Sequence, residues 1–342
     1  MTDLNTLNRH LSRPLVIKGQ TIPKRVILAP MAGLGHIALR HLISGFGGFG
    51  LLVTGMCSAK AVPHENPDVS LVFKWRQTEL PHTVCQIFGP DSGIMAKAAE
   101  RIEKEGFFGV DLNFGCSVSA ICKKGAGAAL LKDPDKAFSI VNQVRKSVSI
   151  PVFVKYRTGW ENNPAFAVDM ARRFEDAGAD ALTFHPRVAP DRRNRPPKWD
   201  IIGRVQDAVS IPVFGNGNLF TREDAAKMLR QTGCMGLSVG RMAVARPWLF
   251  AEWSNGFIPP KDIYYTTAVR MTRLLETHYN EFFSLKLFKK FSPYFCANFK
   301  FGHDILKRLS RAQTMDEIRR TLETIFNADP ETLSRPNPHL FL

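Results

Sequence analysis

Eight short apolar runs, most of them followed by a segment of helical spacing, constrain the fold of this chain more than any other feature. Strands buried on both faces are nearly continuously apolar, and their alternation with helices implies right-handed crossovers and a parallel sheet. Eight such strands are the number that a closed barrel needs. The runs lie at 25–30, 50–55, 82–88, 109–114, 151–157, 180–185, 212–217 and 236–240, and helical spacing is seen at 91–105, 133–147, 163–177 and 221–231.

We therefore predict an α/β fold, a TIM (β/α)8 barrel over about residues 14–245, followed by a C-terminal all-helical domain. The stretch PLVIKGQTIPKRVIL begins with a candidate hairpin that would close the barrel floor. Residues 56–80 carry prolines and mixed polarity, so the helix there is expected to be short or absent. The predicted boundaries are 1–245 for the catalytic barrel and 246–342 for the helical domain.

The charge and the cysteines narrow the class of protein. The 342 residues include 46 Lys and Arg against 31 Asp and Glu, a net charge of +15. Such a surplus favours polyanions such as nucleic acid or a phosphate-bearing cofactor, although a generally basic surface explains the charge alone equally well. The start MTDLNTLNRH carries no export signal, no segment reaches the roughly 20 apolar residues of a membrane span, and the six cysteines show no zinc spacing. We expect a cytoplasmic monomer with free thiols, no membrane contact and no metal.

The helical segment combines basic and aromatic residues. We expect its basic side chains to line a groove and its aromatic rings to pack in a helical core, where phenylalanine usually lies. Between 283 and 311 the chain has the single acid Asp304. The basic residues are Lys286, Lys289, Lys290, Lys300, Lys307, Arg308 and Arg311, and the aromatic residues are Phe283, Phe288, Phe291, Tyr294, Phe295, Phe299 and Phe301.

Polar residues gather where the predicted strands end, which is where TIM barrels carry their active sites. Glycine-bearing turns after the last two strands expose backbone N–H groups that suit a phosphate, and Arg241 adds a charge there. The first strand is not followed by the GxGxxG spacing of a dinucleotide site, so FMN is the best candidate cofactor. Lys155 would then reach the ring edge that becomes negative on reduction, and Gln86 a ring carbonyl or N–H. The strand-end residues are Pro30, Met31, Ala32, Gln86, Asn113, Cys116, Lys155, Arg157, His185, Asn216, Gly217, Asn218, Gly240 and Arg241.

Several of these stretches together resemble the tRNA-dihydrouridine synthases. The matching motifs run in order through the whole barrel: APMAG (29–33), DLNFGC (111–116), KKGAGAALLKDP (123–134), PVFVKYRTGW (151–160), IPVFGNGNLF (211–220) and VGRMAVARPWLF (239–250). The resemblance implies a barrel that holds FMN, is reduced by NADPH or NADH, and reduces the C5=C6 bond of uridine in folded tRNA. It also implies that the C-terminal helical segment binds the tRNA.

The same resemblance assigns roles to residues. It implies FMN contacts from Pro30, Met31, Ala32, Gln86, Lys155, His185, Asn216, Gly217, Asn218, Gly240 and Arg241. Asn113 and Arg157 would face the uracil, Arg187 would belong to the substrate loop, and Cys116 would be the catalytic acid. A thiol with a pKa of about 8.5 is mostly protonated near neutral pH, so the cysteine needs no special tuning to donate a proton.

The chain departs from the family pattern at two places. Ser117 stands where proline usually follows the cysteine, which relaxes the loop. After His185 the stretch HPRVAPDRRNRPPKW keeps Arg187 and stays basic, through Arg192, Arg193, Arg195 and Lys198, but changes the substrate contacts. GNGN replaces the more frequent GNGD, a mild change if that position uses its backbone.

Two alternatives stay open from the sequence alone. One is a flavin barrel that reduces a free small molecule, like dihydroorotate dehydrogenases or enoate reductases, which the basic helical appendage argues against. The other is a barrel that binds RNA and has lost its catalytic activity. Ser117 and the altered stretch after His185 are the reasons for considering it.

Overall fold

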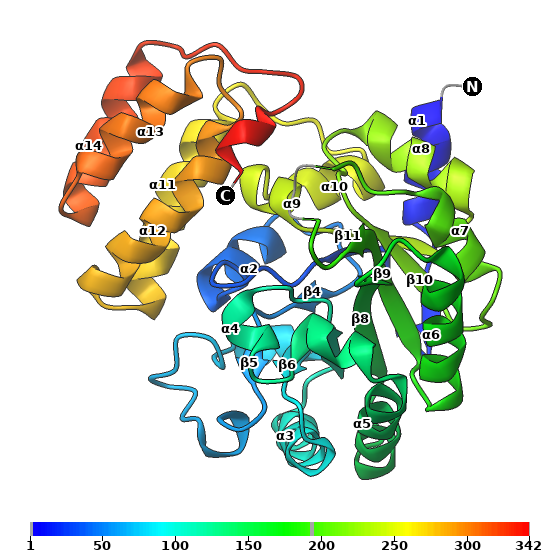
Figure 1. Cartoon of the computed structure of the whole chain (residues 1–342). Helices are drawn as coiled ribbons and strands as arrows, with labels where there is room; N and C mark the ends of the chain where they lie inside the picture. Colours follow the sequence, from blue (N-terminus) through cyan, green and yellow to red (C-terminus); the bar gives the residue numbers. More distant parts are fainter. Residues whose placement is uncertain (1–2, 192–194, 342) are drawn as a thin grey trace.

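The computed structural model describes residues 3–191 and 195–341, and within them eight parallel strands form a barrel (Figure 1). Each strand pairs in parallel with the next, β11 pairs with β3, and a parallel bridge between Ile27 and Leu51 joins β3 to β4. The predicted barrel is therefore confirmed. Its strands are β3 (Val26–Leu28), β4 (Leu52–Val53), β6 (Thr83–Phe88), β7 (Gly109–Phe114), β8 (Val152–Gly159), β9 (Ala181–Val188), β10 (Val213–Asn216) and β11 (Gly236–Val239).

The helices around the barrel begin where the sequence places a cap. Asp91, Asp133, Asn163 and Thr221 each accept a backbone N–H at the start of the following helix, which satisfies a donor that the helix itself cannot. The outer helices are α2 (Ile37–Ser44), α3 (Ser92–Glu105), α5 (Pro134–Ser147), α6 (Pro164–Asp176), α7 (Asp200–Gln206), α8 (Arg222–Thr232) and α10 (Leu249–Asn255).

Two segments outside this repeat differ in how well the sequence anticipates them. Residues 56–80 hold no α-helix, as predicted, but a short strand β5 (Cys57–Ser58) and two 3₁₀ segments, η1 (Val62–His64) and η2 (Gln77–His82). Helix α1 (Asp3–Leu11), which the sequence analysis did not anticipate, packs against α8 and α10.

The lower half of the barrel interior is apolar and closed by a hairpin. Strands β1 (Leu15–Ile17) and β2 (Gln20–Ile22) pair antiparallel, which confirms the predicted hairpin. Its inward side chains join alternate residues of the barrel strands in one buried cluster, because side chains of a strand point alternately to its two faces. The cluster consists of Leu15, Ile17, Ile22, Ile27, Leu51, Val53, Val84, Phe108, Phe153, Ala181 and Phe214.

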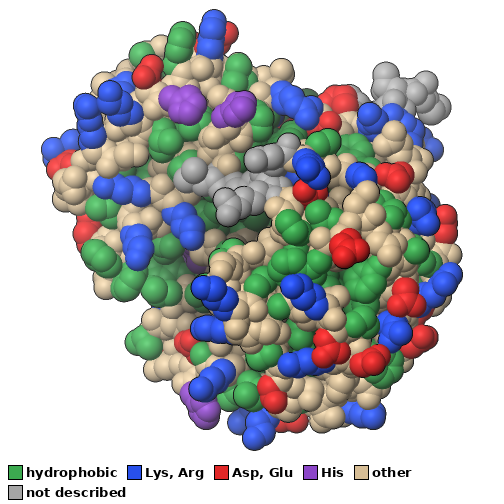
Figure 2. Space-filling model, in the orientation of Figure 1, with side chains coloured by type: hydrophobic (Ala, Val, Ile, Leu, Met, Phe, Trp, Pro, Cys, Tyr) green, Lys and Arg blue, Asp and Glu red, His purple; other side chains and the backbone are tan. Residues whose placement is uncertain are grey.

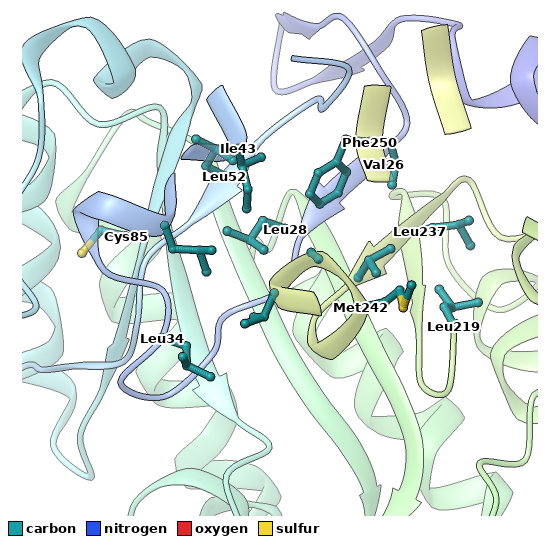
Figure 3. Close-up of a cluster of buried hydrophobic side chains, with 14 of the residues drawn as sticks. Val26, Leu28, Leu34, Ile43, Leu52, Cys85, Leu219, Leu237, Met242 and Phe250 are labelled. Atoms are coloured by element: carbon teal, nitrogen blue, oxygen red, sulfur yellow. The ribbon is translucent and has the colours of Figure 1, made fainter. Parts of the chain in front are cut away.

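The intervening residues of the same strands build the core between barrel and helices. Val26 and Leu28 flank the inward Ile27 and belong to this outer core instead. Figure 3 shows Val26 beside Phe250 of α10, and Leu28 near Ile43 and Leu52. One strand therefore contributes to two cores, which explains why its sequence is continuously apolar.

Four helices form the C-terminal region: α11 (Ile263–His278), α12 (Glu281–Cys296), α13 (Gly302–Arg311) and α14 (Met315–Asn327). Helix α11 contacts α2, and α12 contacts α9 (Arg241–Ala245), the short helix that follows the last barrel strand. Phe288, Phe291, Tyr294, Phe295 and Phe299 are buried as predicted. These contacts set the helical region against the end of the barrel at which the strands finish.

The prediction that Phe301 packs in the helical core is wrong. Its side chain is 65% exposed, because Phe301 immediately precedes α13 and the buried face of that helix is supplied by Gly302, Ile305 and Leu309. Lys300 lies over the exposed ring, with its amine 5.8 Å from the ring centroid.

The hairpin floor makes a testable contribution to stability. Ile17→Ala removes a fully buried side chain from the barrel interior and should lower the free energy of unfolding by about 2–5 kcal/mol. Val16→Ala, on the neighbouring residue that is 58% exposed, should cost under about 0.5 kcal/mol. Denaturant unfolding followed by circular dichroism measures both, and equal costs would show that the hairpin does not close the barrel.

Candidate active site

The barrel interior turns from apolar to charged along each strand. On β8 the inward positions are Phe153, Lys155 and Arg157, and on β9 they continue to His185 and Arg187. Lys155 pairs in register with Thr183, and Arg157 with His185. Every second residue of a strand faces the barrel interior. These inward residues are apolar near the floor of the barrel and polar at its carboxyl end, where TIM barrels carry their active sites.

A cavity of about 460 Å³ opens at this end. It brings together twelve of the predicted site residues: Pro30, Met31, Ala32, Lys155, Arg157, His185, Arg187, Asn216, Gly217, Asn218, Gly240 and Arg241. Five cations lie in its wall, Lys155, Arg157, Arg187, Arg241 and Lys290, and its described lining residues include no Asp or Glu. Cations gathered without acids in a partly closed space favour a ligand that carries negative charge.

The turns after β10 and β11 form one corner of the cavity. The Oδ1 atom of Asn218 accepts hydrogen bonds from Arg241 Nη2 at 2.8 Å and Arg187 Nη2 at 3.1 Å. The side chain at the fourth position of GNGN is thus used directly, so an aspartate there would change the local charge. Asn218 has φ +53°, a left-handed conformation that asparagine tolerates better than most residues.

Two glycines keep this corner open. A Cβ at Gly217, where φ is +127°, would lie 3.1 Å from the His185 ring and from Pro197. A Cβ at Gly240 would lie 2.8 Å from the Met31 sulfur. Both glycines line the cavity beside Arg241, and backbone without a side chain at such a turn is the arrangement that anion-binding turns use.

Gln86 and Asn113 do not line the cavity but form a buried relay beneath it. Gln86 donates through Nε2 to Asp111 Oδ2 at 2.6 Å and accepts from Asn113 Nδ2 at 2.8 Å. Asn113 Oδ1 then accepts the backbone N–H groups of Gly115, at 3.1 Å, and Cys116, at 2.9 Å. The relay therefore runs from a buried carboxyl group to the loop that carries the cysteine.

Asp111 is the member of this relay that the sequence analysis missed. Burial raises the pKa of its carboxyl group, while the Gln86 hydrogen bond and the charge of Lys155 act in the opposite direction. Burial lowers the pKa of Lys155, and Arg157 lowers it further, whereas Asp111 raises it. The available signal was the period of two in GVDLNF, which puts Asp111 on the same face as Asn113.

The loop that carries Cys116 is fixed on both sides. The Cys116 carbonyl accepts from the Ala128 N–H at 2.8 Å and from the Cys122 thiol at 3.4 Å. Arg157 Nε donates to the carbonyl of Gly115 at 2.5 Å, which ties the loop to a side chain of the cavity wall. Cys116 is a free, half-buried thiol, and these bonds hold its backbone without the proline that Ser117 replaces.

The basic loop after His185 is described only in part. Arg192 and Arg193 lie outside the described residues, while Arg195 forms an ion pair with Asp191 at 3.4 Å.

The ring of His185 is neutral at physiological pH, because burial lowers its pKa. Four neighbouring cations lower this pKa further: Arg157, Lys155, Arg187 and Arg241.

Helix α12 contributes two cavity residues, Lys290 and Tyr294, which the sequence analysis assigned only to the helical segment. Their spacing of four shows that they share a helix face but carries no signal of which barrel loop that face meets.

Among the described residues, no group of three or more His, Cys, Asp or Glu is arranged to hold a metal ion. No helix within 3–191 and 195–341 has the length and apolarity to cross a membrane.

Solved structures share the barrel at low sequence identity. The old yellow enzyme from Trypanosoma cruzi superposes with a TM-score of 0.54 at 14% identity, covering 77% of this chain and 97% of its own. A 2-naphthoyl-CoA reductase complex superposes with a TM-score of 0.56 at 14% identity, over 75% of this chain and 53% of the other.

A cavity at the carboxyl ends of a TIM barrel, with a thiol on an adjoining loop, defines the class of this protein as a barrel enzyme. The "Dihydrouridine synthase (Dus)" family model matches residues 27–332. The chain is 32% identical over 303 residues to "tRNA-dihydrouridine synthase B" of Pseudomonas aeruginosa, covering 86% of this chain and 91% of the relative. It is also 32% identical over 323 residues to "Probable tRNA-dihydrouridine synthase" of Mycobacterium tuberculosis, covering 89% and 83%. The chain belongs to the dihydrouridine synthase family and is therefore an oxidoreductase.

A buried histidine close to the cavity makes the stability of the fold depend on pH. His36 caps α2 by accepting the Leu39 N–H through Nδ1 at 3.3 Å, and its Nε2 has no hydrogen-bond partner among the described residues. Burial, followed by the charges of Arg40, Lys290 and His278, lowers the pKa of His36 from 6.5 to about 3. The folded state therefore resists protonation of this ring, whereas the unfolded chain does not.

This histidine should contribute stability above pH 6.5 that is lost as the pH falls toward 3. His36→Asn keeps a side-chain acceptor at the cap and removes the titration. Between pH 6.5 and 5.5 it should lose about 1 kcal/mol less unfolding free energy than the unchanged protein. His82→Asn, at an exposed position, should follow the unchanged protein. Denaturant unfolding at pH 6.5 and pH 5.5 measures these free energies. Equal losses of unfolding free energy in all three proteins would contradict a lowered pKa of His36.

Proposed function

We propose that this protein uses FMN to reduce the C5=C6 bond of uridine in tRNA to 5,6-dihydrouridine. The observation that carries the proposal is the cavity wall, which holds five cations and no acid among the described residues and is tied to the Cys116 loop through Arg157. Both ligands of the reaction, a flavin phosphate and an RNA strand, are anions.

The residues present fit FMN. The corner made by Gly217, Asn218, Gly240 and Arg241 would hold its phosphate, since backbone N–H groups and a fixed arginine charge meet there. Pro30, Met31 and Ala32 would border the ring, with Lys155 and His185 toward its polar edge and Asn216 beneath. When bound, FMN supplies the hydride that reaches C6 of the uracil, after reduction by NADPH, the proposed reductant. Gln86 would contact the ring only from the relay below the cavity.

The part played by the chain's own residues is to bind the base and donate the proton. Addition at C6 requires a proton at C5 from the opposite face, which we assign to the Cys116 thiol. Arg157 and Lys155 would stabilise negative charge on the uracil oxygens. Asn113 would act toward the base only from the relay below the cavity, where it fixes the cysteine loop. Arg187 would contribute a substrate contact from the cavity wall.

The proposed substrate is folded tRNA, as the names of the relatives indicate for those proteins. Extruding a base from the folded RNA costs roughly a few kcal/mol. Contacts between basic residues and phosphates elsewhere on the RNA would offset this cost. Residues 246–342 would supply these contacts as the tRNA-binding domain, through the basic residues between 283 and 311, where Asp304 is the single acid. We further propose that the protein works as a monomer in the cytoplasm.

Replacing the thiol tests the proton-donor role. Cys116→Ala should keep bound flavin and RNA affinity, while formation of dihydrouridine falls by about 10²-fold or more, the usual worth of a general acid. The matched control is Cys122→Ser, which keeps a donor for the Cys116 carbonyl and should stay within a few-fold of the unchanged protein. Mass spectrometry of a tRNA transcript counts the product, and flavin absorbance reports the cofactor.

Two outcomes would overturn the proposal. Turnover by Cys116→Ala at the rate of the unchanged protein would remove the proton-donor role. Activity of the unchanged protein on free pyrimidines but none on RNA would replace uridine in tRNA with a small-molecule substrate.

A further inference from the structure

One cation of the cavity wall comes from outside the barrel. Lys290 belongs to α12, yet it lines the cavity, and its amine lies over Gly33 in the loop that follows β3. Gly33 has φ +66°, and a Cβ at this position would collide with the Lys290 amine. The helical region therefore contributes a positive charge directly above the barrel mouth.

Lys290 is one member of a regular row along α12. Phe282, Lys286, Lys290 and Tyr294 follow each other at intervals of four, so they lie on one face, about 6 Å apart along the helix axis. Phe282 is 68% exposed, Lys286 and Lys290 are exposed, and Tyr294 is 5% exposed in the cavity wall. The row thus leads from solvent into the cavity.

The side chains that α12 buries in the helical core lie on a different face from Phe282, Lys286 and Lys290. Ser284, Phe288, Phe291 and Phe295 are buried in the helical core. We name Phe282, Lys286 and Lys290 the α12 stripe. Within the described residues, neither lysine forms an ion pair, and the acid of α12, Glu281, instead accepts the Met315 N–H at 2.8 Å.

The surroundings of the stripe are also positive. Figure 2 shows a hollow between the helical lobe and the barrel, with Lys and Arg side chains on both of its sides. The row ends at the cavity whose described wall holds five cations and no acid. Continuous positive charge with one exposed aromatic ring at its outer end suits a single nucleic-acid strand, which presents phosphates and stacking bases together.

We propose that the α12 stripe is the track along which the RNA strand that carries the target nucleotide enters the cavity. Lys290 binds the phosphate at the cavity mouth, Lys286 binds the neighbouring phosphate, and Phe282 stacks on a base further out. This inference rests on the proposed function, because it takes RNA as the substrate. It adds that the helical region positions the reacting nucleotide itself, in addition to holding the body of the RNA.

The lysines are tested by the salt dependence of RNA binding. Lys286→Gln combined with Lys290→Gln should raise the Kd for a tRNA transcript roughly tenfold. The slope of the logarithm of the binding constant against the logarithm of the salt concentration should become shallower by about 1.4. Each lost phosphate contact on a single strand accounts for about 0.7 of this change. The control combines Lys97→Gln with Lys104→Gln, two exposed lysines on α3, and should leave both quantities unchanged.

The aromatic ring has its own matched pair. Phe282→Ala should weaken binding about five-fold or more through the loss of one stacked base. Phe301→Ala removes an equally exposed ring, 65% against 68%, from a position off the stripe and should change little. Equal losses in the two alanine variants would contradict the track, as would the same salt slope in the double lysine variant and the unchanged protein.

These results separate the inference from the function on which it rests. If the unchanged protein forms dihydrouridine while the stripe variants bind RNA normally, the track is wrong and the proposed function stands. If the unchanged protein neither binds nor modifies RNA, both fail. Flavin absorbance and thermal unfolding of each variant show whether the fold and the cofactor site are intact, and Lys290→Arg should restore binding where Lys290→Gln loses it.

Discussion

The inward, half-buried position of Lys155 in the barrel governs the electrostatics of the rest of the site. Removing an ammonium group from water is expensive unless charges or hydrogen bonds replace the lost hydration. The charge of the buried Asp111, whose carboxyl group accepts a hydrogen bond from Gln86, offsets part of this cost and raises the pKa of Lys155. Arg157 on the same strand opposes the charge of Lys155, and the cavity wall that both side chains line has no Asp or Glu among its described residues.

The same constraint connects the cofactor region to the cysteine. Because Asp111 engages the amide nitrogen of Gln86, the amide oxygen of Gln86 faces Asn113. The amide oxygen of Asn113 is then left to accept the N–H groups of the cysteine loop. The backbone of Cys116 is thus linked to the carboxyl group of Asp111 through the side chains of Gln86 and Asn113. All three of these side chains point into the barrel.

Much of this arrangement follows from the sequence, because a strand's period of two fixes which residues face inward. The eight runs predicted the barrel, and the residues at strand ends predicted eleven members of the cavity wall, to which the family resemblance added Arg187. Asp111 was missed since it stands inside an apolar run and not at its end. Helix α1 was missed because its docking on α8 and α10 is a tertiary contact without a local signal.

The residues that the helical region adds to the site are hardest to predict from sequence. Lys290 and Tyr294 have the spacing of any surface helix, and only the packing of α12 against α9 brings them to the cavity. Phe301 shows the converse, since its aromatic character suggested burial while its place ahead of α13 leaves it exposed. In both cases the outcome depends on how two separately predictable parts meet.

An anaerobic titration shows whether the reduced flavin of this protein delivers its electrons to uridine in tRNA. The protein loaded with FMN is reduced with NADPH, freed of excess reductant, and mixed with a tRNA transcript that lacks dihydrouridine. The account predicts that the flavin band returns as one dihydrouridine forms for each flavin reoxidised. A flavin that stays reduced in the presence of the transcript but is reoxidised by a free pyrimidine or enoate would contradict it.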